Sequence, residues 1–103
     1  MATGILGQAD IAASTNTTLY TVPASTTSTF NLNLVNRGPS VVAVRISISA
    51  SGTPTNEEYI EYDWPLGVGD ILERTGIVAG AGENVVIFAT AAGVSANVYG
   101  YEV

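Results

Sequence analysis

The sequence predicts an all-β fold: an antiparallel β-sandwich, Ig-like or jelly-roll-like, with about seven to eight strands and no helix. Apolar and polar residues alternate over short runs, which is the period of a half-buried strand. Clusters of Gly, Pro, Asn and Ser separate these runs at intervals of about 8–12 residues, as in sandwiches and barrels. The composition agrees, because 47% of the residues are apolar and only 12% are charged. A chain of 103 residues forms one small domain.

Seven segments carry the strand pattern: 17–22, 29–36, 41–50, 58–64, 70–78, 84–89 and 94–103. The second of these alternates most clearly, with Phe30, Leu32 and Leu34 on one face. Residues 36–40 contain Asn, Gly and Pro, which favour turns for separate backbone reasons. The second and third segments are therefore expected to form a β-hairpin.

Two later segments carry specific expectations about their faces. The same period of two places Ile60, Tyr62 and Trp64 on one face of the segment 58–64. Residues 84–89 are almost continuously apolar, which is typical of a strand buried on both faces.

The first fifteen residues allow two interpretations. Residues 1–15 are rich in Ala, Gly and Ser, with Ile5, Leu6 and Ile11 as apolar anchors. They form either the first strand of the sandwich or an arm that docks onto a neighbouring protein. Residues 16–103 make the single sandwich domain in both cases. The segment lacks the basic and apolar regions of a signal peptide, so none is expected.

The charge balance argues against two classes of partner. Three arginines stand against nine acidic residues, for a net charge of −6. Nucleic acids and anionic membranes both need clustered cations, so neither is expected as a partner. Arg37 and Arg74 are expected to pair with carboxylates of a neighbouring subunit, with pairing of Arg74 to its own Glu73 as the alternative.

The missing residue types argue against catalysis. His, Cys and Lys are all absent, which removes the commonest general bases, thiolate nucleophiles and zinc ligands. The many hydroxyl side chains have no obvious base to activate them. We therefore expect a protein that is not an enzyme and that uses no cofactor and no metal.

An acidic group and several aromatic residues are the remaining candidates for binding. Glu57, Glu58, Glu61 and Asp63 are paired carboxylates of the kind that calcium sites and glycosidases use, but the strand period separates them over two faces. An acidic, solvated face is the favoured interpretation.

The aromatic residues allow three roles. Tyr59, Tyr62 and Trp64 can pack in the core, contact another protein or stack on a sugar ring, and Tyr99 with Tyr101 can form a second such platform. Core and protein interface are favoured over carbohydrate, because Tyr and Trp are enriched at protein interfaces.

Several segments resemble those of small β-sandwich virion proteins of tailed bacteriophages, especially marine ones. The opening Thr-Thr-Leu-Tyr-Thr-Val-Pro-Ala at 17–24 and Asn-Leu-Asn-Leu-Val-Asn-Arg-Gly at 31–38 are similar to the start of these proteins. Residues 44–48, 59–63 and 98–102 are similar to their later segments, so the resemblance spans most of the chain.

The resemblance implies a structural protein of the virion, assembled in the host cytoplasm. Its expected role is capsid decoration (cement), in which a homotrimer binds the major capsid protein at junctions between capsomers. A tail or fibre protein is the alternative on the same particle, where the partner is a tail protein. The absence of heptads and fibrous repeats favours decoration.

A carbohydrate-binding module is the second alternative, with Trp64 and the tyrosines as its stacking face and the carboxylates of 57–63 as a calcium site. For the leading role, the residues expected to contact a partner are Ile5, Leu6, Ile11, Arg37, Tyr59, Tyr62, Trp64 and Arg74.

Overall fold

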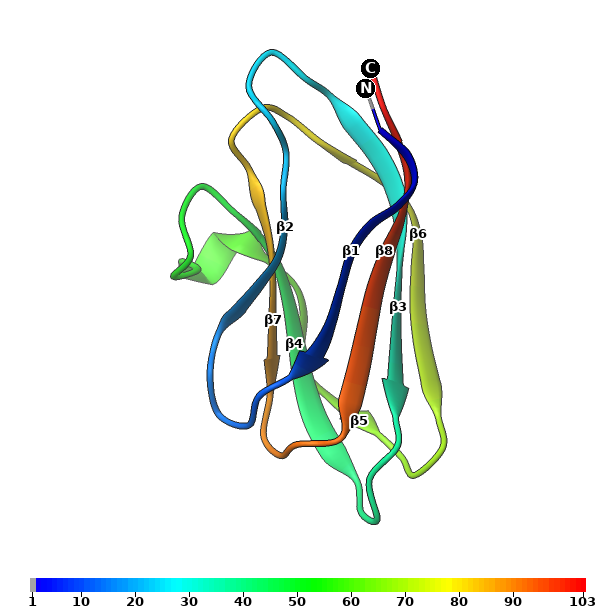
Figure 1. Ribbon diagram of the computed structural model, residues 1–103. Helices are drawn as coiled ribbons and strands as arrows, with labels where there is room; N and C mark the ends of the chain where they lie inside the picture. Colours follow the sequence, from blue (N-terminus) through cyan, green and yellow to red (C-terminus); the bar gives the residue numbers. More distant parts are fainter. Residues whose placement is uncertain (1) are drawn as a thin grey trace.

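The computed structural model describes residues 2–103 and shows an all-β sandwich of two four-stranded antiparallel sheets (Figure 1). The strands are β1 (Thr3–Ile11), β2 (Thr17–Thr21), β3 (Ser28–Asn36), β4 (Val42–Ser49), β5 (Tyr59–Leu66), β6 (Ile71–Ala79), β7 (Asn84–Ala89) and β8 (Val94–Glu102). Within residues 2–103 the helical structure is limited to a single 3-10 turn, η1 (Asn56–Glu58). The seven predicted strand segments are confirmed, with ends that differ by at most two residues. No helix in this range is long and apolar enough to cross a membrane.

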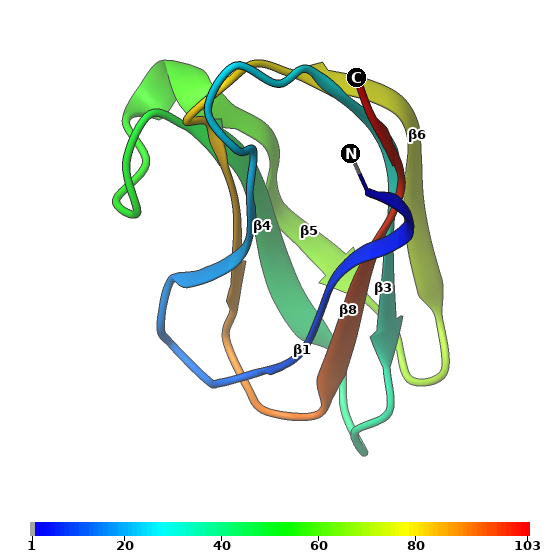
Figure 2. The ribbon, with the colours of Figure 1, turned by 45° about the horizontal axis from the view of Figure 1, so that its top comes forward.

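The order of the strands identifies the sandwich as a jelly roll. Sheet A has the order β1-β8-β3-β6 and sheet B has the order β2-β7-β4-β5. The pairs β1 with β8, β2 with β7, β3 with β6 and β4 with β5 are all hydrogen-bonded. The chain is therefore a long antiparallel hairpin rolled into two sheets, which is the jelly-roll arrangement and differs from the Ig one. Figure 2 shows the two sheets facing each other, with the first and last strands, β1 and β8, side by side in sheet A.

The core lies between the sheets and follows the predicted alternation. β3 shows strict alternation, with Phe30, Leu32 and Leu34 at most 1% exposed. Residues of β8 and β7 complete the layer from both sheets: Val94, Ala96, Val98, Val85 and Ile87. Each large apolar side chain buried in this way contributes about 1.5–3 kcal/mol to the free energy of unfolding.

β7 is buried on both faces, as its apolar sequence predicts. Val85 and Ile87 face the core, whereas Val86 lies opposite Ser47 on the outer face and is still only 1% exposed. The 3-10 turn η1, which follows β4, lies against this end of the outer face. Its Glu58 accepts a hydrogen bond at 2.8 Å from the hydroxyl of Ser49, the last residue of β4. Part of the outer face of sheet B is therefore covered by the protein itself.

The first segment of the chain is a strand. β1 pairs with β8 over almost its whole length, from Thr3 opposite Tyr101 to Ile11 opposite Val94. A Cβ at Gly7 would lie 2.3 Å from the carbonyl oxygen of Leu19, so the edges of the two sheets approach each other backbone to backbone there. Residues 3–11 therefore form a first strand of the sandwich, as one of the two interpretations of residues 1–15 expects.

The hairpin predicted for β3 and β4 is wrong, because the two strands lie in different sheets. Asn36 at the end of β3 is fully buried and accepts a bond from the amide of Gly38, which turns the chain. Its own amide group donates to the carbonyls of Ser40 and Leu66 at 2.8 and 2.9 Å. These bonds carry the chain across the end of the sandwich into sheet B.

Candidate functional site

The outer face of sheet B carries a cluster of aromatic rings around one arginine. The guanidinium carbon of Arg45 lies 4.3 Å from the centre of the Tyr62 ring and 4.8 Å from that of Phe88. The Arg45 Nε donates to Asp63 at 2.6 Å, and Tyr59 meets Tyr62 edge to face at 5.0 Å. We call these five residues the aromatic–arginine cluster. Three strands, β4, β5 and β7, contribute to it.

Strand register explains why these residues meet. Arg45 of β4 lies directly opposite Phe88 of β7, so their side chains share one face. On the other side, Val44 pairs with Trp64 and Ile46 pairs with Glu61, so the one residue of β4 between these pairs faces two residues of β5, Tyr62 and Asp63. The extra residue is a β-bulge, and Asp63 has a positive φ of 51°.

The bulge overturns the predicted face of β5. It turns both Tyr62 and Asp63 outward, while Trp64 lies opposite the fully buried Val44. Ile60, Tyr62 and Trp64 therefore do not share a face. Tyr62 is 59% exposed and joins Tyr59 in the cluster, whereas Trp64 lies apart from it at the edge of sheet B.

Electrostatics hold the cluster together. The Asp63 carboxylate raises the pKa of Arg45 above its usual value, chiefly through their hydrogen bond, so the arginine stays charged. A guanidinium stacked on aromatic rings keeps its cation–π attraction while its edge donates to the carboxylate. The result is a fixed, mostly neutral patch with an aromatic surface.

The other two arginines are bound within the chain. Arg74 donates to Glu61 at 2.7 Å and to the carbonyl of Ile60 at 3.0 Å, which joins β6 of sheet A to β5 of sheet B. Arg74 does not pair with Glu73, so the alternative that predicted this ion pair is wrong. Arg37 is half exposed and binds Asp10 at 2.6 Å.

The three apolar residues expected to contact a partner from the first segment differ in exposure. Ile11 is 1% exposed and belongs to the core, so it is not available to a partner and that expectation is wrong. Leu6 is half-buried and packs against the same core. Ile5 is 57% exposed on sheet A.

The carboxylates of 57–63 do not gather into a calcium site. Glu58 turns toward the β4 end and accepts bonds from the amides of Ala50 and Thr55 at 3.0 and 2.8 Å. These backbone bonds are the main cause that lowers the pKa of Glu58 to about 2. Glu61 and Asp63 each bind an arginine. Residues 2–103 contain no group of three or more acidic or other ligating side chains that could hold a metal ion.

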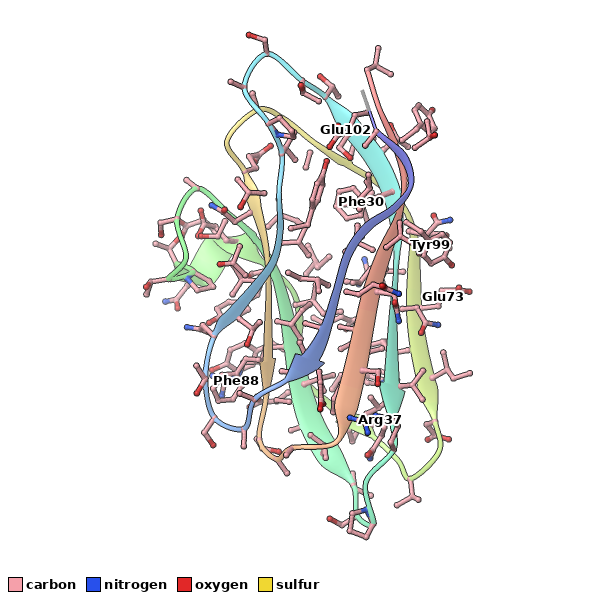
Figure 3. All side chains as sticks on the ribbon, in the orientation of Figure 1. Phe30, Arg37, Glu73, Phe88, Tyr99 and Glu102 are labelled. Atoms are coloured by element: carbon pink, nitrogen blue, oxygen red, sulfur yellow. The ribbon has the colours of Figure 1, made fainter. Side chains whose placement is uncertain are left out.

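The second aromatic pair lies on the opposite surface. Tyr99 and Tyr101 point outward from the central strand β8 of sheet A, and Tyr101 is 49% exposed. Figure 3 shows Tyr99 and Glu73 on the side of the molecule away from Phe88. The two groups of aromatic residues are therefore separated by the whole sandwich.

Sequence reasoning missed Arg45 and Phe88. Their meeting depends on pairing of β4 with both β5 and β7, which the sequence does not specify. One local signal was present, since Arg45 is the only charged residue in an otherwise apolar and small-residue strand.

Comparisons with known proteins identify no relative of the chain. No protein-family model, curated protein or solved structure matches the chain. The functional argument therefore depends on the surfaces described above and on the resemblance of the sequence segments.

Proposed function

We propose that the chain is a non-enzymatic structural protein of a tailed-bacteriophage virion. In this role it is a decoration protein that binds the major capsid protein on the outer shell, at junctions between capsomers, and stabilises the particle. Assembly takes place in the host cytoplasm. The resemblance of five sequence segments and a fold that viral capsid domains also use support the proposal.

The observation that carries the proposal is the aromatic–arginine cluster. Tyr and Arg, together with Trp, are enriched among the residues that contribute most of the binding energy of protein interfaces, and the contacts around them contribute little energy. Here one side of the Tyr62 ring is covered by Arg45, and the ring also meets Tyr59 in an edge-to-face pair. A sugar would have less of this ring to stack on, so the cluster favours a protein partner over a glycan.

A homotrimer suits this role. Capsids of tailed phages have many three-fold and quasi-three-fold positions, and a partner of matching symmetry can make the same contact three times. Repeated contacts raise the overall affinity well above that of one copy, so a single cluster per subunit is sufficient. The cluster would then face the shell from each of the three copies.

Cryo-electron microscopy of the particles that carry the chain tests the location. We expect density of this size over capsomer junctions, in groups of three, with β4, β5 and β7 toward the shell. Density restricted to the tail would overturn the decoration role and assign the chain to the tail or a fibre.

A reattachment assay tests the contact itself. Stripped particles are mixed with wild-type protein, with Phe88→Ala or with Ile71→Ser, which changes an exposed residue of β6 in the other sheet. We expect Phe88→Ala to weaken attachment by about thirtyfold, the effect of losing an interface residue worth about 2 kcal/mol. Ile71→Ser should attach like the wild type. Equal attachment by all three proteins would exclude the cluster as the contact.

A further inference from the structure

The outer face of sheet A has a different chemistry from the cluster, and it suggests a second binding function. One row of side chains crosses all four strands in register: Gln8 of β1, Asn97 of β8, Asn33 of β3 and Glu73 of β6. Gln8 Nε2 donates to Asn97 Oδ1 at 2.8 Å, so the amides hold each other in place. The row presents fixed donors and acceptors on a flat surface.

An aromatic ring lies beside this row. The hydroxyl of Tyr99 on β8 donates to Glu73 Oε2 on β6 at 2.7 Å, and β3 lies between these two strands. The side chain must therefore cross over β3, where Asn31 is its cross-strand neighbour. Tyr99 is half-buried, so part of its side chain stays open to solvent. Figure 3 shows Tyr99 and Glu73 together on this surface.

An open hollow of about 400 Å³ continues the row on β1 and β8. Its polar lining comes from Gln8, Asp10, Ser95 and Asn97. Arg37 fixes the far end, because it donates to Ser95 Oγ at 2.7 Å and to Asp10 Oδ1 at 2.6 Å. These bonds leave Asp10 Oδ2 and Gln8 Oε1 as acceptors and Asn97 Nδ2 as a donor toward a ligand.

We propose that this face of sheet A binds a neutral glycan. A sugar ring has an apolar face that suits the solvent-exposed side of the Tyr99 ring, and its hydroxyl groups both donate and accept, as the residues of the hollow do. Arg37 balances the charge of Asp10, and Glu73 leaves the face with a net negative charge, so a sugar acid would be repelled. From Ser95 to Tyr99 the strand rises about 13 Å, a length that a short oligosaccharide covers.

A peptide fits the same surface less well. Peptides that bind a sheet commonly add a strand to a free edge. The central strand β8 is paired on both sides, with β1 and with β3, so its backbone groups are used. The binding groups of this face are therefore side chains alone. The inference is independent of the proposed function, because the aromatic–arginine cluster lies on the opposite sheet.

Array screening tests the ligand class. The full chain is applied to a printed array of neutral and acidic bacterial and algal polysaccharides, including laminarin, dextran and alginate. We expect binding to one or more neutral polysaccharides and none to the polyuronate alginate. No binding to any neutral polysaccharide on the array, or equal binding to alginate, would overturn the proposal.

Variants and NMR test the site. Kd is measured for the neutral polysaccharide that binds most strongly on the array. Tyr99→Ala should raise this Kd about tenfold, and the double variant Gln8→Ala/Asn97→Ala should raise it by about the same factor. Val41→Ser, at an exposed position in the loop before β4, should bind like the wild type. Amide shift changes in the wild-type chain should be confined to the strands of sheet A, β1, β8, β3 and β6. Shift changes centred on the aromatic–arginine cluster would show that the glycan does not bind to sheet A. This measurement uses the wild-type chain, so it does not depend on whether the variants fold.

Discussion

The two outer faces of the sandwich differ in how they hold their polar groups. On sheet B, Arg45 is stacked between Tyr62 and Phe88 and its charge is matched by Asp63. On sheet A, amide, hydroxyl and carboxylate groups are spread over four strands in cross-strand rows. The first face has a compact aromatic centre, and the second has a flat network of donors and acceptors.

This difference shows how one core can support two unrelated surfaces. Because side chains alternate along each strand, β3 and β8 bury Leu32 and Val98 while they present Asn33 and Asn97 to solvent. Similarly, β4 and β7 bury Val44 and Ile87 and leave the opposite positions for the cluster. The outer residues can change without altering the layer that determines the fold.

The largest expected effect comes from breaking both faces together. A Cβ at Gly100 would lie 2.1 Å from the carbonyl oxygen of Thr29 and 2.6 Å from Cα of Phe30, between two central strands. We expect Gly100→Ala to lower the free energy of unfolding by about 3 kcal/mol, measured by urea denaturation, and to impair particle attachment and glycan binding alike.

Gly52→Ala is the matched control, because its new Cβ would meet Thr18 Oγ1 at an ordinary 3.6 Å. It should change stability by less than about 0.5 kcal/mol. Wild-type stability of Gly100→Ala would show that β8 and β3 can separate, and that the two faces do not depend on one rigid core.

The link between the sheets gives the next effect. Arg74→Leu removes the partner of Glu61, whose side chain is 21% exposed, and leaves its carboxylate half-buried. We expect a loss of about 1–2 kcal/mol in urea denaturation. Arg37→Leu removes a pair that is 50% and 74% exposed and should cost less than about 0.5 kcal/mol. Equal losses would mean that the pair between the sheets contributes no more than a surface pair.

A double-mutant cycle measures the cohesion of the cluster. Arg45→Ala, Tyr62→Ala and the double variant are compared in the same unfolding assay. We expect a coupling energy of about 0.5–1 kcal/mol, the usual size of a partly exposed cation–π contact. The same cycle on Gln8 and Asn97 gives the corresponding value for sheet A. A coupling energy of zero at Arg45 would show that the stacked geometry makes no contribution to stability.

The smallest effect is a local response to acid on sheet B. The folded pKa of Glu58 is about 2, below its ordinary value of 4.5, so its bonds are fully present above pH 4.5 and are lost as the pH falls toward 2. Amide exchange by NMR should show protection of Ala50 and Thr55 decreasing over that range. Glu58→Gln should remove the pH dependence, and amides of β8 should keep their protection. Unchanged protection of both residues at pH 2 would contradict the assignment.

The alternation of apolar and polar residues was sufficient to predict where the strands lie, but it was not sufficient to predict which strands pair with each other. The alternation in 29–36 identifies β3 and its buried face, since that information lies within one strand. The destination of β4 depends instead on the buried Asn36, whose bonds reach Leu66 in a strand thirty residues away. Likewise, no local pattern indicates the bulge at Asp63, which decides that Tyr62 and not Trp64 faces Arg45. The aromatic–arginine cluster therefore depends on strand pairing between residues that are far apart in the sequence.

The pairing of the first strand with the last has a consequence for how the chain reaches its folded state. β1 can find its hydrogen-bonding partner only after residues 94–102 have been made, so sheet A closes after the other strands of the sandwich are available. The hairpin of β4 and β5 involves the shortest loop of the four pairs, and later pairs must close progressively longer ones. We therefore expect slow folding that begins at this central hairpin and ends with β1, measurable as a late gain of protection at residues 3–11.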